Sequence, residues 1–200
     1  MAKKPAEVVN SDKREPTKIS QDQISIGVPD VVKVAIAGAL MEFANMEAAL
    51  EVLIWEITGL SFDDGRLLTK QDISAKIKLT KRLSEKYQIA APKVKRGMPT
   101  MWRAMEDLLQ PRNQIAHGMW VMIDLKIPAA ASYRIPSEPD QMAADAFPIH
   151  RLEAIARQSK EIRECLDWMI DAAHTWRAKL AAPHRKNSPI PKPLPTPPQK

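Results

Sequence analysis

Two long segments carry apolar residues at the spacing of one helix face, and they constrain the fold more than any other feature. The first runs from about Pro29 to Ile57 and the second from about Pro148 to Leu180. In both, apolar side chains recur every three or four residues, the repeat of an α-helix that buries one side. The first stripe consists of Ala39, Phe43, Met46, Leu50, Leu53, Ile57 and Leu60. Such stripes predict long helices that pack against other helices.

Two shorter helices are predicted between these segments, at about residues 69–87 and 99–118. In the helix predicted at about residues 69–87, apolar residues face the core and the Lys and Arg residues face solvent. Residues 120–125 read as a strand, and residues 132–135 are expected to pair with it as a hairpin. The chain has only six glycines. The predicted fold class is therefore all-α, a bundle of about four main helices with a small β-hairpin between helices three and four.

Both ends of the chain are expected to be tails around one domain. Residues 1–27 are polar, without sustained periodicity, and are predicted to be a disordered N-terminal tail. Residues 28–182 form the helical domain. Residues 183–200 form a disordered, proline-rich basic tail, whose PxxP spacing could alternatively recruit a polyproline-binding partner.

Composition narrows the class of protein further. The start of the chain lacks the apolar centre of a secretory signal, and no run approaches the ~20 apolar residues of a membrane span. We therefore expect a soluble cytoplasmic protein with no membrane association.

The single cysteine, Cys165, excludes an internal disulfide and argues against a cysteine metal site. We expect it to be a small buried thiol, and we expect neither a metal nor another cofactor.

Positive charge is concentrated in the middle of the chain. Residues 66–103 contain eleven Lys and Arg residues against only Asp72 and Glu85, whereas the whole chain has a net charge of +6. Such a strip can attract phosphate backbones, or it can be a solvated helix face that keeps the protein soluble. Both interpretations stay open. The five tryptophans fit core or interface positions better than base-stacking platforms.

Arg112 interrupts the apolar stripe of the third predicted helix, directly after Pro111, which we expect to kink that helix. A guanidinium there must be paired, reach solvent, or bind an anion. Asn113 and His117 share a neighbouring helix face, one turn apart. The structural alternative is an ion pair between Arg112 and Glu47 or Glu51, with His117 as an ordinary helix-terminal histidine.

Arg112, Asn113 and His117 suit the cleavage of RNA. A neutral imidazole can take the proton of a ribose 2′-hydroxyl, and a guanidinium can hold two phosphate oxygens. The amide can orient the phosphate or the imidazole. Arg177 and His184 also have a compatible spacing, but Ala178 follows that arginine and the match runs into the proline-rich tail, so we reject it.

The segment from Arg112 to Gly118 resembles the Arg-x4-6-His motif of the HEPN superfamily, with Arg112, Asn113 and His117 at its three motif positions. The resemblance covers about residues 29–180 and departs at Pro111. It implies a metal-independent endoribonuclease that acts as a homodimer, with RNA as substrate and a 2′,3′-cyclic phosphate product. A toxin or defence setting, with an antitoxin or nucleotidyltransferase partner, rests on this analogy. The alternative is a non-catalytic HEPN-like module that dimerises and binds a nucleotide, RNA or a protein.

Overall fold

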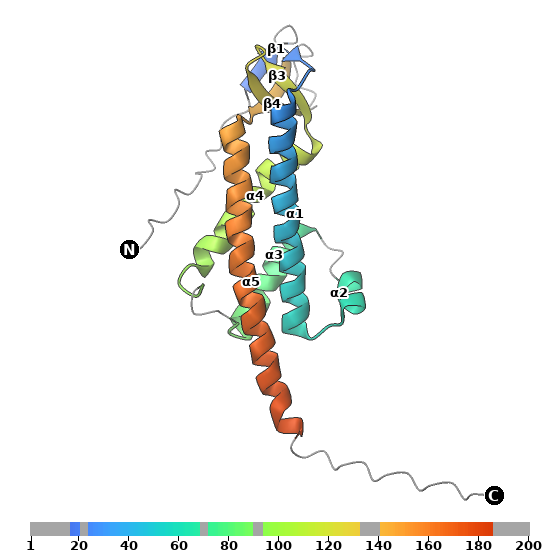
Figure 1. Ribbon diagram of the computed structural model, residues 1–200, viewed down its shortest axis with the longest axis vertical. Coiled ribbons are helices and arrows are strands. Elements are labelled where there is room, and N and C mark those ends of the chain that lie inside the picture. Colours follow the sequence, from blue (N-terminus) through green and yellow to red (C-terminus); the bar gives the residue numbers. More distant parts are fainter. Residues whose placement is uncertain (1–16, 21–23, 69–71, 90–93, 133–140, 186–200) are drawn as a thin grey trace, which may run out of the picture.

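A computed structural model describes residues 17–20, 24–68, 72–89, 94–132 and 141–185. It contains five helices in its described residues, and a small antiparallel sheet caps one end of them (Figure 1). The helices are α1 (Asp30–Thr58), α2 (Phe62–Leu68), α3 (Ile73–Lys86), α4 (Met98–His117) and α5 (Ile149–Arg185). The prediction of a mainly helical protein with a small β element is confirmed.

α1 and α5 form the frame of the molecule. Both begin beside the sheet and run in the same direction along each other (Figure 1). Their buried positions alternate in steps of three and four, the repeat by which two helices keep one seam in contact. On α1 these positions are Ala39, Phe43, Met46, Leu50, Leu53 and Ile57, and on α5 they are Leu152, Ile155, Ser159, Ile162, Leu166, Met169 and Ala173. At the far end Arg177 Nη1 donates to Glu56 Oε2 at 3.3 Å and fixes this register.

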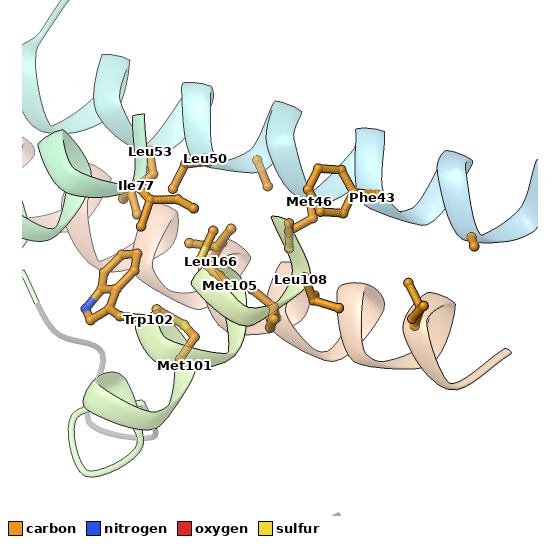
Figure 2. Close-up of a cluster of buried hydrophobic side chains, with 14 of the residues drawn as sticks. Phe43, Met46, Leu50, Leu53, Ile77, Met101, Trp102, Met105, Leu108 and Leu166 are labelled. Atoms are coloured by element: carbon orange, nitrogen blue, oxygen red, sulfur yellow. The ribbon is translucent and has the colours of Figure 1, made fainter. Parts of the chain in front are cut away.

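α3 and α4 complete the core from one side of the α1–α5 pair. Figure 2 shows Ile77 of α3 and Trp102 and Met105 of α4 meeting Leu50 of α1 and Leu166 of α5. All of these side chains are at most 3% exposed. Full burial of each is worth about 1.5–3 kcal/mol, so the meeting of the four helices is the centre of stability.

The short helix α2 docks on the C-terminal end of α1 and was not predicted. Trp55 of α1 packs edge-on against Phe62, with ring centroids 5.4 Å apart. A Cβ at Gly65 would lie 2.6 Å from the Trp55 ring, so only glycine fits this contact. Gly59 ends α1 with a left-handed φ of 76°, as expected of a helix stop.

The β element is larger than the predicted hairpin and its register differs. The strands β1 (Thr17–Ser20), β2 (Ile24–Ser25), β3 (Met119–Ile123), β4 (Ile127–Ser132) and β5 (Gln141–Ala146) form one sheet in the order β1-β5-β4-β3-β2. β3 pairs with Ile127–Ala131 of β4; of the segment 132–135 predicted to be its partner, Ser132 ends β4 and residues 133–135 lie outside the described residues.

The turn between β3 and β4 explains the wrong register. Asp124 and Leu125 both have positive φ, and Lys126 N donates to Ile123 O at 3.0 Å. A two-residue turn with positive φ at both positions usually has Asn or Gly there, so Leu125 did not indicate a turn at this point of the sequence. Pro128 within β4 also reads as a strand breaker.

The domain boundaries differ at both ends. β1 and β2 fall inside the stretch predicted to be an N-terminal tail, so that prediction is wrong for these strands. α5 continues to Arg185, beyond the expected boundary at residue 182. The rest of the predicted tails lies outside the described residues. No helix in the described part of the chain is long and apolar enough to cross a membrane.

Candidate functional site

The C-terminal turn of α4 is fixed to the sheet by three contacts. Gln114 Nε2 donates to the Asp145 carboxylate of β5, and Trp120 Nε1 donates to Ile115 O at 3.1 Å. Gly118 follows the helix in extended conformation, so it does not act as a left-handed cap. It is needed for space instead, because a Cβ there would lie 2.8 Å from the Cβ of Ala130 and 2.5 Å from a backbone oxygen. The helix end is thereby held in one position.

Arg112 lies on this turn and is half-buried. Its guanidinium carbon is 5.6 Å from the centroid of the Phe43 ring, within cation–π range. Its Nη1 donates to Asn113 Oδ1 at 3.1 Å. The guanidinium therefore lies against the Phe43 ring of α1 while its Nη1 is bound to the exposed amide of Asn113.

The structural alternative, an ion pair of Arg112 with Glu47 or Glu51, is not formed. Both carboxylates accept from Lys76 Nζ instead, Glu47 Oε1 at 2.8 Å and Glu51 Oε1 as well. Lys76 is only 5% exposed, so the prediction that every Lys and Arg of this helix faces solvent is wrong for it. Burial alone lowers the pKa of Lys76, but the hydrogen bonds to both carboxylates outweigh it and the pKa is raised.

Arg112 consequently keeps its positive charge without a carboxylate. Among the described residues its contacts are a neutral amide and an aromatic ring. Neither neutralises a cation. A guanidinium in this state retains donors for two oxygens of an incoming phosphate or carboxylate.

His117 is the last residue of α4 and is exposed. Its side chain makes no hydrogen bond or ion pair with the part of the chain that the structure describes, so the structure joins the Arg112 and Asn113 side chains but does not join the imidazole to either. Asn113 and His117 do lie on one exposed face, four residues apart. α4 is one continuous helix through Pro111.

Other chemistry has less support. Among the described residues, no group of three His, Cys, Asp or Glu side chains could hold a metal ion. Burial, with Glu164 and Glu161 nearby, raises the pKa of the Cys165 thiol, which disfavours the nucleophilic thiolate. Arg177 of the rejected second motif is bound to Glu56. The side chain of His184 lies outside the described residues.

The sequence did not indicate that Arg112 contacts the Phe43 ring. It also did not indicate that Lys76 binds Glu47 and Glu51. Phe43 belongs to the seam stripe of α1, and nothing in its spacing signals a contact with a cation. Lys76 is one of eleven basic residues in its segment, and spacing along α3 does not separate it from its exposed neighbours.

The fold and this surface together define a mainly helical protein whose helix end presents an arginine, an amide and an imidazole. Comparisons with protein-family models, with curated proteins and with solved structures found no match.

Proposed function

We propose that the chain is a HEPN-like, metal-independent endoribonuclease that uses Arg112, Asn113 and His117. The observation that carries the proposal is the Arg112 guanidinium, which has no carboxylate partner among the described residues and is hydrogen-bonded at 3.1 Å to an exposed amide, with an exposed histidine on the same helix end. Because its side chain is half-buried and has no ion pair with a described residue, the guanidinium retains donors that an incoming anion can use.

The proposed reaction needs no nucleophile from the protein. Neutral His117 takes the proton of a ribose 2′-hydroxyl, and the 2′-oxygen attacks the adjacent phosphorus. The bond from phosphorus to the 5′-oxygen breaks, that oxygen takes a proton from water as it leaves, and His117 returns its proton to the resulting hydroxide. Arg112 holds the two non-bridging oxygens as their charge builds, and Asn113 orients them. The products are a 2′,3′-cyclic phosphate and a 5′-hydroxyl.

A homodimer is part of the proposal because the motif is exposed in a single copy of the chain. A second copy would enclose the reacting groups and exclude water. Separately from the motif, α1 carries an apolar face suited to self-association, since Val31, Val34 and Met41 are 60%, 72% and 60% exposed at helical spacing. Single exposed apolar residues are ordinary, but three on the same face of one helix suit an interface. We expect Val34→Glu to weaken self-association in sedimentation analysis and Lys33→Glu to matter much less.

The deciding experiment is RNA cleavage in excess chelator. We expect the wild type to cut single-stranded RNA and to leave the same strand intact when the nucleotide at the cut is 2′-deoxy. Arg112→Ala and His117→Ala should each lose activity by at least about 100-fold, the usual size of a lost general base or anion contact. Arg103→Ala on the same helix and His150→Ala on α5 are matched controls at exposed positions and should cut normally.

Wild-type protein that leaves varied RNAs intact would remove the enzymatic proposal. The alternative is then a non-catalytic HEPN-like module, favoured by the separation of His117 from the Arg112–Asn113 pair. Salt-dependent retention of RNA without product would support that alternative.

A further inference from the structure

An open groove lies at the opposite end of the bundle from the sheet, where α5 extends past the end of α1 (Figure 1). Its volume is about 780 Å³, and its walls include Glu56, Tyr87, His174, Trp176 and Arg177. None of the residues proposed for cleavage lines it.

Two aromatic rings form one wall of this groove. The centroids of Tyr87 and Trp176 are 5.2 Å apart and their planes are inclined by 50°. Both side chains are half-buried, so each packs partly on the core and presents the remainder to the groove. A tilted pair of this kind offers ring faces to a planar ligand, and every nucleobase has such a face.

A row of positive charge on α3 ends at these rings. Lys86 Nζ lies 5.1 Å from the centroid of Tyr87. Arg82 and Lys78 precede Lys86 by one and two turns on the same helix face, and all three are exposed. None of them forms an ion pair with a described residue. The row can therefore follow a phosphate backbone up to the rings.

Glu56, the one carboxylate among the described residues that line the groove, is already neutralised. Glu56 Oε2 lies 3.3 Å from Arg177 Nη1 and 3.6 Å from His174 Nδ1. Arg177 also lies against the backbone of Gly59, so its role is to hold α5 to the end of α1. The groove therefore repels an anion only weakly. The cations of α3, which form no ion pair with a described residue, attract one.

We propose that this groove binds a segment of single-stranded RNA, with a base stacked on Trp176 and Tyr87 and phosphates along Lys86, Arg82 and Lys78. The inference rests on the proposed function for its ligand class, and it adds a second contact surface remote from the motif. Phe43, beneath Arg112, and Glu56 are thirteen residues apart on α1, which places the two surfaces about 20 Å apart along the helix. A dinucleotide cannot reach both.

The test measures binding without cleavage. A 2′-O-methyl single-stranded oligonucleotide of about 12 nucleotides, within the usual range of single-strand site sizes, cannot be cut and reports the dissociation constant by fluorescence anisotropy. Trp176→Leu keeps apolar packing and removes the indole, and it should raise the dissociation constant by roughly 5- to 150-fold, the value of one stacked base. Trp168→Leu, at an exposed position on the same helix, should leave it unchanged.

A separate experiment tests the positive charges, with substitutions at exposed residues that do not pack in the core. Lys86→Gln together with Arg82→Gln should weaken binding and reduce the slope of log affinity against log salt by about 1.4, two single-strand phosphate contacts. Lys126→Gln, in the exposed turn at the sheet end, is the matched control and should change neither quantity. This double variant keeps the proposal testable even where Trp176→Leu fails to fold.

Three results would overturn the proposal: no binding by the wild type, equal effects of the target and control variants, or equally tight binding of poly-glutamate. The last would mean that the groove recognises acidic chains in general. Failure of cleavage with intact, Trp176-dependent binding would instead remove the proposed enzymatic function and leave this surface in place. Arg112→Ala and His117→Ala should bind the oligonucleotide through the groove while losing cleavage.

Discussion

Lys76 is the buried cation on which the packing of α3 against α1 depends, and its replacement by methionine tests the fold directly. The ammonium is held by Glu47 and Glu51, which lie one turn apart on α1. Without it, two like charges would face each other on adjacent turns in a partly buried site. We therefore expect Lys76→Met to be clearly destabilising although methionine fills a similar volume.

The magnitude follows from the geometry. Removing one partner of a buried ion pair costs 3–5 kcal/mol when the remaining charge stays dry. The carboxylate side chains here are 25% exposed, so water recovers part of that cost. A loss of about 2–4 kcal/mol in the free energy of unfolding is expected, or roughly 4–16 °C in melting temperature for a chain of this length. Urea unfolding gives the free energy, and an unchanged m-value shows that the fold is kept.

Two further variants separate charge from packing. Lys78→Met, at an exposed position two residues along α3, should change stability by at most about 0.5 kcal/mol. Adding Glu47→Gln and Glu51→Gln to Lys76→Met should recover most of the loss, because the stranded charges are then gone. Equal stability of Lys76→Met and Lys78→Met would refute the reasoning.

The pKa of Lys76 sets the pH range of this effect. Because the folded pKa is raised, the stabilisation is fully present below the pKa of an unfolded lysine, about 10.4. It is lost as the pH rises through the higher folded value. The difference between wild type and Lys76→Met should be constant between neutral pH and pH ~9, and should shrink only above about pH 10.4.

Four other outcomes are expected. Gly118→Ala should cost about 1–3 kcal/mol in thermal unfolding because its Cβ meets Ala130 and a backbone oxygen, whereas Gly38→Ala, with nothing within 4 Å of the new Cβ, should gain about 0.5–1 kcal/mol. Ser159→Ala should raise stability by about 1 kcal/mol, since the buried hydroxyl has no hydrogen-bond partner among the described residues. The raised pKa of Cys165 should make its reaction with a disulfide reagent slower at neutral pH than that of the urea-unfolded chain, and faster as the pH rises. Arg112→Met should leave stability unchanged or increase it while abolishing cleavage, and a loss above about 2 kcal/mol would mark Arg112 as structural.

The long helices could be predicted because their signal is local and repeated. The seam of α1 continues for about five turns at three- and four-residue steps, and Gly59 supplies the left-handed stop. α5 was predicted from about residue 148 for the same reason. Its extension to Arg185 was not, because Pro183 reads as the start of an extended tail. Helix propensity and periodicity decide such elements within one segment of chain.

The sheet and the ion pairs could not be predicted because they depend on residues far apart in sequence. β1 pairs with β5 across more than a hundred residues, and neither strand has a strongly alternating pattern. The same holds for Glu47 and Glu51, because their spacing on α1 does not distinguish a partner on α3 from one on α4. Which cation they take depends on the tertiary distance of Lys76 and Arg112 from α1, and spacing along one helix does not contain that distance.

The absence of the alternative ion pair with Glu47 or Glu51 strengthens the functional interpretation of Arg112. An arginine neutralised by Glu47 would need no ligand, and its place on an apolar stripe would be explained by structure alone. Because Lys76 binds both carboxylates, Glu47 and Glu51 have a cationic partner without Arg112. The ring of Phe43 gives the guanidinium about 0.5–2 kcal/mol, which offsets part of its desolvation but leaves its hydrogen-bonding edge available. A cation held in place by a ring and an amide, on a helix end locked to the sheet by Gln114, is pre-organised for an anion at no reorganisation cost when the anion arrives.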